Sequence, residues 1–294
     1  MSRPTALDLP ETVVARRLET SRGAFAVLDA APAAEVPARG TALLIPGFTG
    51  SKEDFTALLG PLSAAGYRVV AVDGRGQYET DGPRDERAYA QRELAADVVA
   101  QTAALVDGGG PPHLLGHSLG GLITRSAVIS EAAQGRHPWA SLTLMSSGPA
   151  AIDASQQART QMLLDGLPAL GFDMEAVWQV MRSLDAENSE QPDTPAAIDA
   201  FLHRRWVTTV PEQLMATARQ LMTETDRVDE LAAVPLPKFV ISGEVDYAWP
   251  VPWVDAMAVR LNAPRVVIKG AEHSPNAERP AETAAALIGF WSRD

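Results

Sequence analysis

The 294-residue chain lacks cysteine, which excludes disulfides, thiolate catalysis and zinc sites built from cysteine. It also lacks an uncharged apolar run of about 18 residues, the length that a membrane-spanning helix needs. Residues 1–20 mix acidic and basic side chains and lack the apolar core of a signal peptide. Basic residues are few: 25 Lys and Arg against 37 Asp and Glu give a net charge of −12. Because nucleic acid and anionic membranes attract basic patches, we expect neither as a partner and predict a soluble, cytoplasmic protein.

What the chain does contain is an alternation of short apolar, β-branched runs with longer amphipathic stretches. The runs expected to form strands are 13–18, 24–28, 42–45, 68–72, 113–116, 141–145, 238–242 and 265–268. The stretches expected to form helices around them are 52–65, 87–106, 119–134, 252–261 and 279–291. Such alternation predicts an α/β fold with a doubly wound, mainly parallel eight-stranded sheet, and the first two strands form an antiparallel hairpin at its edge.

Residues 150–234 interrupt this alternation, because they show helical patterns and no convincing strand. Helices are expected at 153–164, 174–183, 196–207 and 211–224, with breaks at Gly166, Pro168, Pro192 and Pro195. A helical stretch of this length between two sheet strands predicts an inserted helical cap. The core then comprises residues 1–149 and 235–294, and the cap comprises residues 150–234.

The pentapeptide Gly116-His117-Ser118-Leu119-Gly120 lies between an expected strand and an expected helix. A sharp turn there would present the serine hydroxyl openly to a base, which a serine nucleophile requires. Glycines on either side leave room for such a turn because they carry no Cβ. Ser118 is therefore the candidate nucleophile.

The base that Ser118 needs can be sought among five histidines. His273 directly follows the last expected strand, so it lies at the same edge of a parallel sheet as Ser118. The others are placed less well: His113 is within a strand, His137 is in a loop, His203 is on a cap helix, and His117 is expected to point away from the oxyanion side of the turn. We therefore predict that His273 is the base.

A carboxylate must orient that histidine. Asp246 follows the strand at 238–242 and would reach the same sheet edge, whereas Glu244 leaves the strand sooner and should point elsewhere. Asp246 is therefore favoured over Glu244. Backbone N–H donors for an oxyanion are expected at Leu119, which follows the nucleophile, and at Phe48, in the loop after the strand at 42–45.

These residues resemble the α/β-hydrolase superfamily over about residues 10–150 and 235–294. The chain order Ser118, Asp246, His273 is that of the family, and Pro46-Gly47-Phe48 is similar to its His-Gly-x oxyanion loop, with proline in place of histidine. The segment 72–76 (Val-Asp-Gly-Arg-Gly) is similar to its Asp-x-x-Gly turn, which is usually structural. The resemblance implies a serine hydrolase, in the first place a carboxylic-ester hydrolase that forms an acyl-enzyme.

Other reactions occur on this fold. Haloalkane dehalogenases and epoxide hydrolases place Asp at the elbow, where this chain has Ser118. Carbon–carbon bond hydrolases and cofactor-free haloperoxidases or perhydrolases keep the same triad, so both alternatives stay open. A non-enzymatic small-molecule binder on this fold is the third alternative.

We expect a small-molecule substrate, namely a small to medium, largely apolar ester, lactone or thioester. Candidate residues of its binding site are Trp178, Met181, Trp206, Met215, Tyr247 and Trp249. No cap residue forms an obvious clamp for a charged group, although Arg182, Arg204 and Arg205 stay open for that role. The mechanism requires no cofactor or metal, and His113 and His117 lie too far apart along a strand and its turn to share one ion. The protein is expected to be a monomer or a homodimer.

Overall fold

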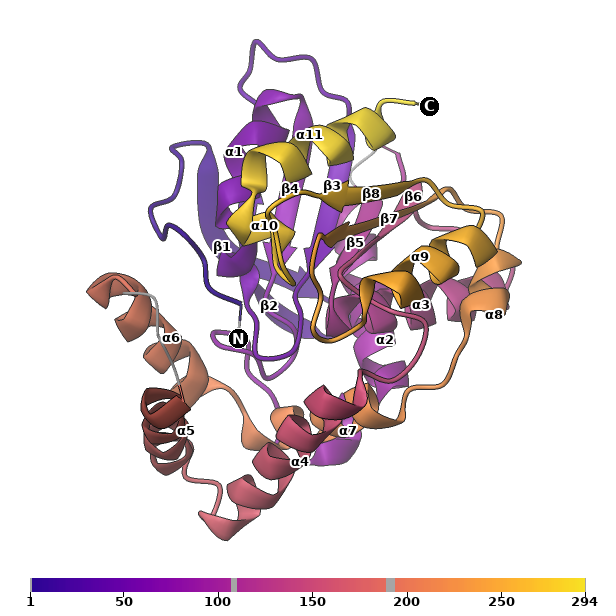
Figure 1. Cartoon of the computed structure of the whole chain (residues 1–294). Helices are drawn as coiled ribbons and strands as arrows, with labels where there is room; N and C mark the ends of the chain where they lie inside the picture. The colour runs from indigo at the N-terminus through magenta and orange to yellow at the C-terminus, as the bar shows by residue number, and fades with distance from the viewer. Residues whose placement is uncertain (1, 107–109, 189–193, 294) are drawn as a thin grey trace.

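The computed structural model describes residues 2–106, 110–188 and 194–293, and an eight-stranded sheet forms its centre (Figure 1). The strands are β1 (Val13–Thr20), β2 (Gly23–Ala30), β3 (Gly40–Ile45), β4 (Tyr67–Val72), β5 (His113–His117), β6 (Ser141–Met145), β7 (Lys238–Gly243) and β8 (Arg265–Ile268). Their spatial order is β1-β2-β4-β3-β5-β6-β7-β8. β2 pairs antiparallel with β1 and β4, and all other neighbours pair in parallel. The predicted fold class and edge hairpin are confirmed.

Helices cover both faces of this sheet. They are η1 (Lys52–Phe55), α1 (Thr56–Ala64), η2 (Glu86–Tyr89), α2 (Gln91–Leu105), α3 (Leu119–Ala132), α9 (Val251–Arg260), α10 (Pro275–Glu278) and α11 (Pro280–Trp291). Leu114 of β5 packs into an apolar cluster with α2, α3 and α9, whereas the next residue, Leu115, packs into a second cluster with α1 and α11. Successive strand residues point to opposite faces, so β5 is buried on both sides.

Between β6 and β7, the described residues form five helices. They are α4 (Ala154–Ala169), α5 (Met174–Asn188), α6 (Ala196–Thr208), α7 (Pro211–Thr223) and α8 (Val228–Ala232). Figure 1 shows α4 to α7 along one end of the sheet, where α4 lies beside α7 and α5 lies beside α6. Leu167, Trp178, Phe201 and Leu214 belong to an apolar cluster of this segment. That residues 150–234 form a separate cap domain stays a prediction.

The helix boundaries differ from the expected ones in several places. α4 does not break at Gly166 or Pro168 but runs through both to Ala169. Leu167, between them, is fully buried in the apolar cluster of α4 to α7, and this packing outweighs the cost of a proline in the last turn. Pro195 directly precedes α6 as expected, whereas the break expected at Pro192 lies outside the described residues.

Two other expected helices are divided. The stretches 52–65 and 87–106 each begin with a separate 3₁₀ turn, η1 and η2, and the short helices α8 and α10 were not expected.

No helix in the described ranges combines the length and the apolar character needed to cross a lipid bilayer. The parallel strands β3, β5, β7 and β8 bring the loops at their carboxyl ends to one edge of the sheet, where the candidate site lies.

Candidate active site

Ser118 occupies a strained turn between β5 and α3. Its backbone φ of 55° and ψ of −121° lie in a region that side chains rarely adopt. A Cβ atom on Gly116 would lie 2.3 Å from the carbonyl oxygen of Gly120, and one on Gly120 would lie 2.4 Å from the carbonyl oxygen of Ile45. The sequence forms this elbow because only glycine allows such close backbone approach on both sides of the serine.

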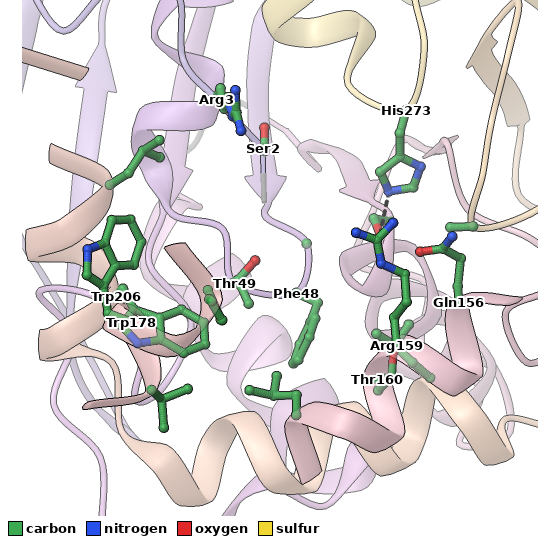
Figure 2. Close-up of a pocket in the computed structure, with 18 of the residues that line it drawn as sticks. Ser2, Arg3, Phe48, Thr49, Gln156, Arg159, Thr160, Trp178, Trp206 and His273 are labelled. Carbon is green, nitrogen blue, oxygen red and sulfur yellow. Dashed lines mark hydrogen bonds between the residues drawn. The ribbon is translucent and has the colours of Figure 1, made fainter. Parts of the chain in front are cut away.

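His273 extends from the loop between β8 and α10 toward the elbow. Its Nε2 lies 3.0 Å from Oγ of Ser118, and its Nδ1 lies 3.0 Å from both carboxylate oxygens of Asp246. Because a carboxylate only accepts hydrogen bonds, Nδ1 donates and Nε2 is left to accept from the serine hydroxyl. The dashed line from His273 in Figure 2 marks this bond.

Asp246 is held in place by the backbone that follows it. Its Oδ1 also accepts hydrogen bonds from the N–H groups of Ala248 and Trp249, at 2.8 and 3.0 Å. Its side chain is fully buried. The rival acid Glu244 is exposed and accepts a hydrogen bond from the N–H of Gly270 instead. Of the two expected acids, the structure therefore brings only Asp246 to His273.

The loop after β3 contacts the elbow directly, since a Cβ on Gly47 would lie 2.9 Å from Cβ of Ser118. Gln77 Nε2 donates to the Gly47 carbonyl at 2.9 Å and so orients this loop. In the described part of the chain, the N–H groups of Phe48 and Leu119 make no hydrogen bond to a protein acceptor. Two unpaired donors thus lie on the residues where oxyanion donors are expected.

The turn after β4 supports this loop through a buried ion pair. Asp73 accepts hydrogen bonds from the backbone N–H and the Nζ of Lys52, at 2.8 and 3.0 Å. Burial lowers the pKa of Lys52, but the nearby Asp73 and Glu53 carboxylates outweigh it and raise that pKa above its usual value. The structure therefore agrees with a structural role for this turn, because the charges of Asp73 and Lys52 face each other rather than the pocket.

His117 lies differently from what the sequence suggested. As the last residue of β5 it points to the same face as Leu115, and its ring lies 5.3 Å from that of His273 and next to Gly47. It therefore lies beside the loop that carries the candidate oxyanion donor, and the expectation that it points away was wrong. Burial, and then the neighbouring His273, lower the pKa of His117 to about 4, so the ring is neutral at physiological pH.

A pocket of about 950 Å³ opens in front of Ser118 and His273 (Figure 2). Of the residues expected to bind substrate, four line it: Trp178, Met181, Trp206 and Tyr247. Further apolar lining comes from Phe48 and from helices α4 and α5. This volume is typical of a site for a small or medium-sized molecule.

Met215 and Trp249 do not line the pocket, so their expected role was wrong. Met215, on α7, is buried in the apolar cluster that α4 to α7 share. The Trp249 indole is fully buried and packs against Gly148, whose Cβ position would lie 2.0 Å from the ring, and its N–H donates to the Ala150 carbonyl at 2.8 Å. Apolar side chains at these positions stabilise the fold rather than contact a ligand.

Several polar residues of the pocket were not identified from the sequence. Gln156, Arg159 and Thr160 of α4 line it, as do Arg3 and Asp54. The three α4 residues stand at i, i+3 and i+4, so they share one helix face. Their spacing in the sequence indicates the shared face, but it does not indicate whether that face points toward the pocket. No group of three or more His, Asp or Glu side chains is arranged to hold a metal in the ranges that the structure describes.

Comparisons with known proteins agree with the fold. Over 101 residues the chain is 38% identical to RutD of Variovorax paradoxus, a protein provisionally named as a carbamate hydrolase. That match spans 33% of this chain and only 36% of the relative.

Solved structures match over almost the whole chain. An epoxide hydrolase from metagenomes of hot environments is similar with a TM-score of 0.74 at 18% identity, covering 98% of this chain and 100% of its own. A carboxylesterase of the thaumarchaeon Nitrososphaera gargenis is similar with a TM-score of 0.71 at 18% identity, covering 94% and 97%. At such low identity these likenesses show the fold alone.

The sequence pattern of the alpha/beta hydrolase family matches residues 42–286. That range includes the elbow, the loop after β3, and the loops that carry Asp246 and His273. This chain therefore belongs to the alpha/beta hydrolase family and is a hydrolase.

Proposed function

We propose that this protein is a serine hydrolase that cleaves a small to medium, largely apolar carboxylic ester, or a lactone or thioester, through an acyl-enzyme. The observation that carries the proposal is the 3.0 Å contact between Nε2 of His273 and Oγ of Ser118, with Asp246 on Nδ1 of the same ring. A base within hydrogen-bond reach of a hydroxyl, itself oriented by an acid, is the arrangement that activates serine.

In the first step, Oγ of Ser118 bonds to the carbonyl carbon of the ester while its proton moves to Nε2 of His273. The carbonyl oxygen becomes an oxyanion, which accepts hydrogen bonds from the N–H groups of Phe48 and Leu119. When the tetrahedral intermediate collapses, the bond to the alcohol oxygen breaks and His273 gives that oxygen its proton. The alcohol leaves, and the acyl group stays on Ser118.

In the second step, water replaces the alcohol. His273 takes a proton from the water as the water oxygen bonds to the acyl carbon, and a second oxyanion forms at the same two N–H groups. Collapse breaks the bond to Oγ, which recovers its proton from His273, and the carboxylic acid is released. Asp246 stays ionised and stabilises the imidazolium each time it forms.

The substrate class rests on the pocket. Phe48, Leu163, Trp178 and Trp206 give it large apolar surfaces, which bind the hydrocarbon part of an ester by excluding water. The relative named for carbamate hydrolysis makes ethyl carbamate a further substrate to assay, because a carbamate is attacked at the same kind of carbonyl carbon.

The proposal is tested with a fluorophosphonate probe, which labels an activated serine covalently. Wild-type protein should be labelled, and Ser118→Ala should not. If wild type is not labelled, or if the variant labels equally well, Ser118 is not the nucleophile. A panel of p-nitrophenyl esters of graded chain length then measures acyl preference.

The panel also separates the alternatives on this fold. A protein that is labelled at Ser118 yet hydrolyses no ester would point to carbon–carbon bond hydrolysis or perhydrolysis on the same triad. A protein that is neither labelled nor active, but binds small molecules, would be a non-enzymatic binder.

A further inference from the structure

The charges that line the pocket do not balance. Its lining contains three arginines and two aspartates, although the chain as a whole is strongly acidic. Both aspartates are paired: Asp54 with Arg205 at 2.7 Å, and Asp199 with Arg182 at 3.4 Å. Arg3 and Arg159 are the lining cations left without a carboxylate among the residues that the structure describes.

Arg159 is the cation next to the reacting groups. Figure 2 shows its side chain extending from α4 toward His273, with Gln156 beside it. The Tyr247 ring lies 4.9 Å from the ring of His273. Burial and the Asp246 carboxylate raise the pKa of Tyr247 to about 12, and the charge of Arg159 opposes that rise. The guanidinium therefore acts electrostatically on Tyr247, whose ring lies beside that of His273.

Arg159 has no structural task that would explain its position. Its side chain is exposed, and within the described ranges it makes no hydrogen bond or ion pair. The acids of α4 and its start, Asp153 and Asp165, are each six residues away from Arg159, so they lie on a different face of the helix. Gln156 and Thr160, on the same face as Arg159, also have side chains without a hydrogen bond among the described residues.

We infer that the substrate carries a carboxylate close to its scissile ester, and that Arg159 binds this carboxylate with help from Gln156 and Thr160. The inference rests on the proposed function and narrows its substrate class to half-esters of dicarboxylic acids and related anionic esters. A guanidinium presents two parallel N–H donors that match the two oxygens of a carboxylate. The apolar part of the substrate then lies along Phe48 and Trp178.

The reaction on such a substrate is ordinary hydrolysis. With monoethyl succinate, water adds across the ester bond, ethanol leaves, and succinate forms with release of one proton at neutral pH. Arg159 takes no part in bond making, so it is a specificity-determining residue. Its effect should appear in the choice between substrates.

The experiment compares matched ester pairs in a pH-stat at pH 7.5. Monoethyl malonate, succinate and glutarate are each paired with the neutral ester in which an amide replaces the free carboxylate. Wild-type protein should have a higher kcat/KM for the anionic member of at least one pair. Arg159→Gln should lower that anionic-to-neutral ratio by roughly 10- to 100-fold, the effect of one charge-assisted contact. Arg159→Lys should keep part of the preference because it keeps the charge.

Arg92→Gln is the matched control, because it removes the same charge from a largely exposed side chain on α2, away from the pocket lining. It should leave the ratio unchanged. Three results would overturn the inference while leaving the proposed function intact. Wild type could show no preference for the anionic ester, the anionic-to-neutral ratio could stay unchanged in Arg159→Gln, or it could fall equally in Arg92→Gln. Failure of the fluorophosphonate to label Ser118 would instead overturn the proposed function, and the inference with it.

Discussion

The imidazole of His117 donates a hydrogen bond from Nε2 to the main-chain carbonyl of His273, over 2.9 Å. Because a carbonyl only accepts, the proton of the neutral ring must be on Nε2. This bond joins the residue before the candidate nucleophile to the residue that is the candidate base, although 156 positions separate them in the chain. His117 is therefore a positioning residue, which acts on catalysis by holding the loop of His273.

Replacement of this donor should affect turnover more than substrate binding. In His117→Phe the ring keeps its bulk but cannot donate, so the His273 carbonyl loses its partner and the loop loosens. We expect kcat on a p-nitrophenyl ester to fall about fivefold, from the loss of roughly 1 kcal/mol of positioning. KM should change little. His137→Phe, in an exposed loop, is the control, and equal kcat values for both variants would contradict the role.

The same residue should make stability depend on pH. The pKa of His117 is about 4 in the folded protein against 6.5 unfolded, so the unfolded chain binds more protons below pH 6.5 and stability falls as pH falls from about 7 toward 4. Between pH 7.5 and pH 5, wild type should lose about 2 kcal/mol more than His117→Phe. Urea unfolding of both proteins at the two pH values measures this difference. An identical loss in the two proteins would show that His117 titrates normally.

The assignment of the acid can be tested by exchanging oxygen for nitrogen. Asp246→Asn keeps the shape of the side chain but favours the wrong tautomer of His273, so kcat should fall about 10⁴-fold. Glu244→Gln should leave kcat near wild type, because Glu244 is exposed and bonded to Gly270. Steady-state kinetics on the ester that wild type hydrolyses best provides the comparison. The reverse ranking of the two variants would make Glu244 the acid.

The role of the loop after β3 in binding the oxyanion can be tested by a substitution at Gly47. In Gly47→Ala the new methyl group would lie 2.9 Å from Cβ of Ser118, so the loop must shift and carry the Phe48 N–H away from the oxyanion. We expect kcat to fall about 10²- to 10³-fold, the usual effect of losing one such donor. Gly289→Ala, where no atom lies within 4 Å, should keep full activity and stabilise α11 by up to about 1 kcal/mol. Unimpaired kcat in Gly47→Ala would remove Phe48 from the mechanism.

A buried ion pair links the helical segment to the core. Arg205 of α6 lies 2.7 Å from Asp54 of η1, and both side chains are almost fully buried. Arg205→Met leaves the Asp54 charge unpaired and should lower the free energy of unfolding by about 3–5 kcal/mol. Adding Asp54→Leu should restore much of that loss, because the unpaired charge is then gone. Chemical denaturation of both variants measures these free energies of unfolding. A double variant less stable than Arg205→Met would contradict the prediction.

The triad could be predicted because each member follows a strand within a short local pattern. Gly116 and Gly120 mark the elbow, and Asp246 and His273 each follow a predicted parallel strand, so the edge that they share follows from strand direction alone. Met215 and Trp249 were misassigned for the opposite reason. An apolar side chain on a helix or beside a strand can pack inward or face a ligand, and only its neighbours decide between these orientations.

The orientation of the polar residue Arg159 could not be predicted from the sequence either. Its spacing with Gln156 and Thr160 shows that the three share a face of α4, but the direction of that face depends on how α4 packs on α7 and α5. His117 was misplaced because a turn was expected to carry its side chain away, whereas the last residue of β5 keeps the alternation of the strand.

The sequence alone therefore determined the fold class, the order of the candidate nucleophile, acid and base, and the edge of the sheet where they meet. These follow from local periodicity and from the steric limits of glycine, which act over a few residues. The tertiary structure decided which side chains surround Ser118 and which charges there lack a partner. Those properties arise from contacts between segments far apart in the chain, such as Arg205 with Asp54 and His117 with His273.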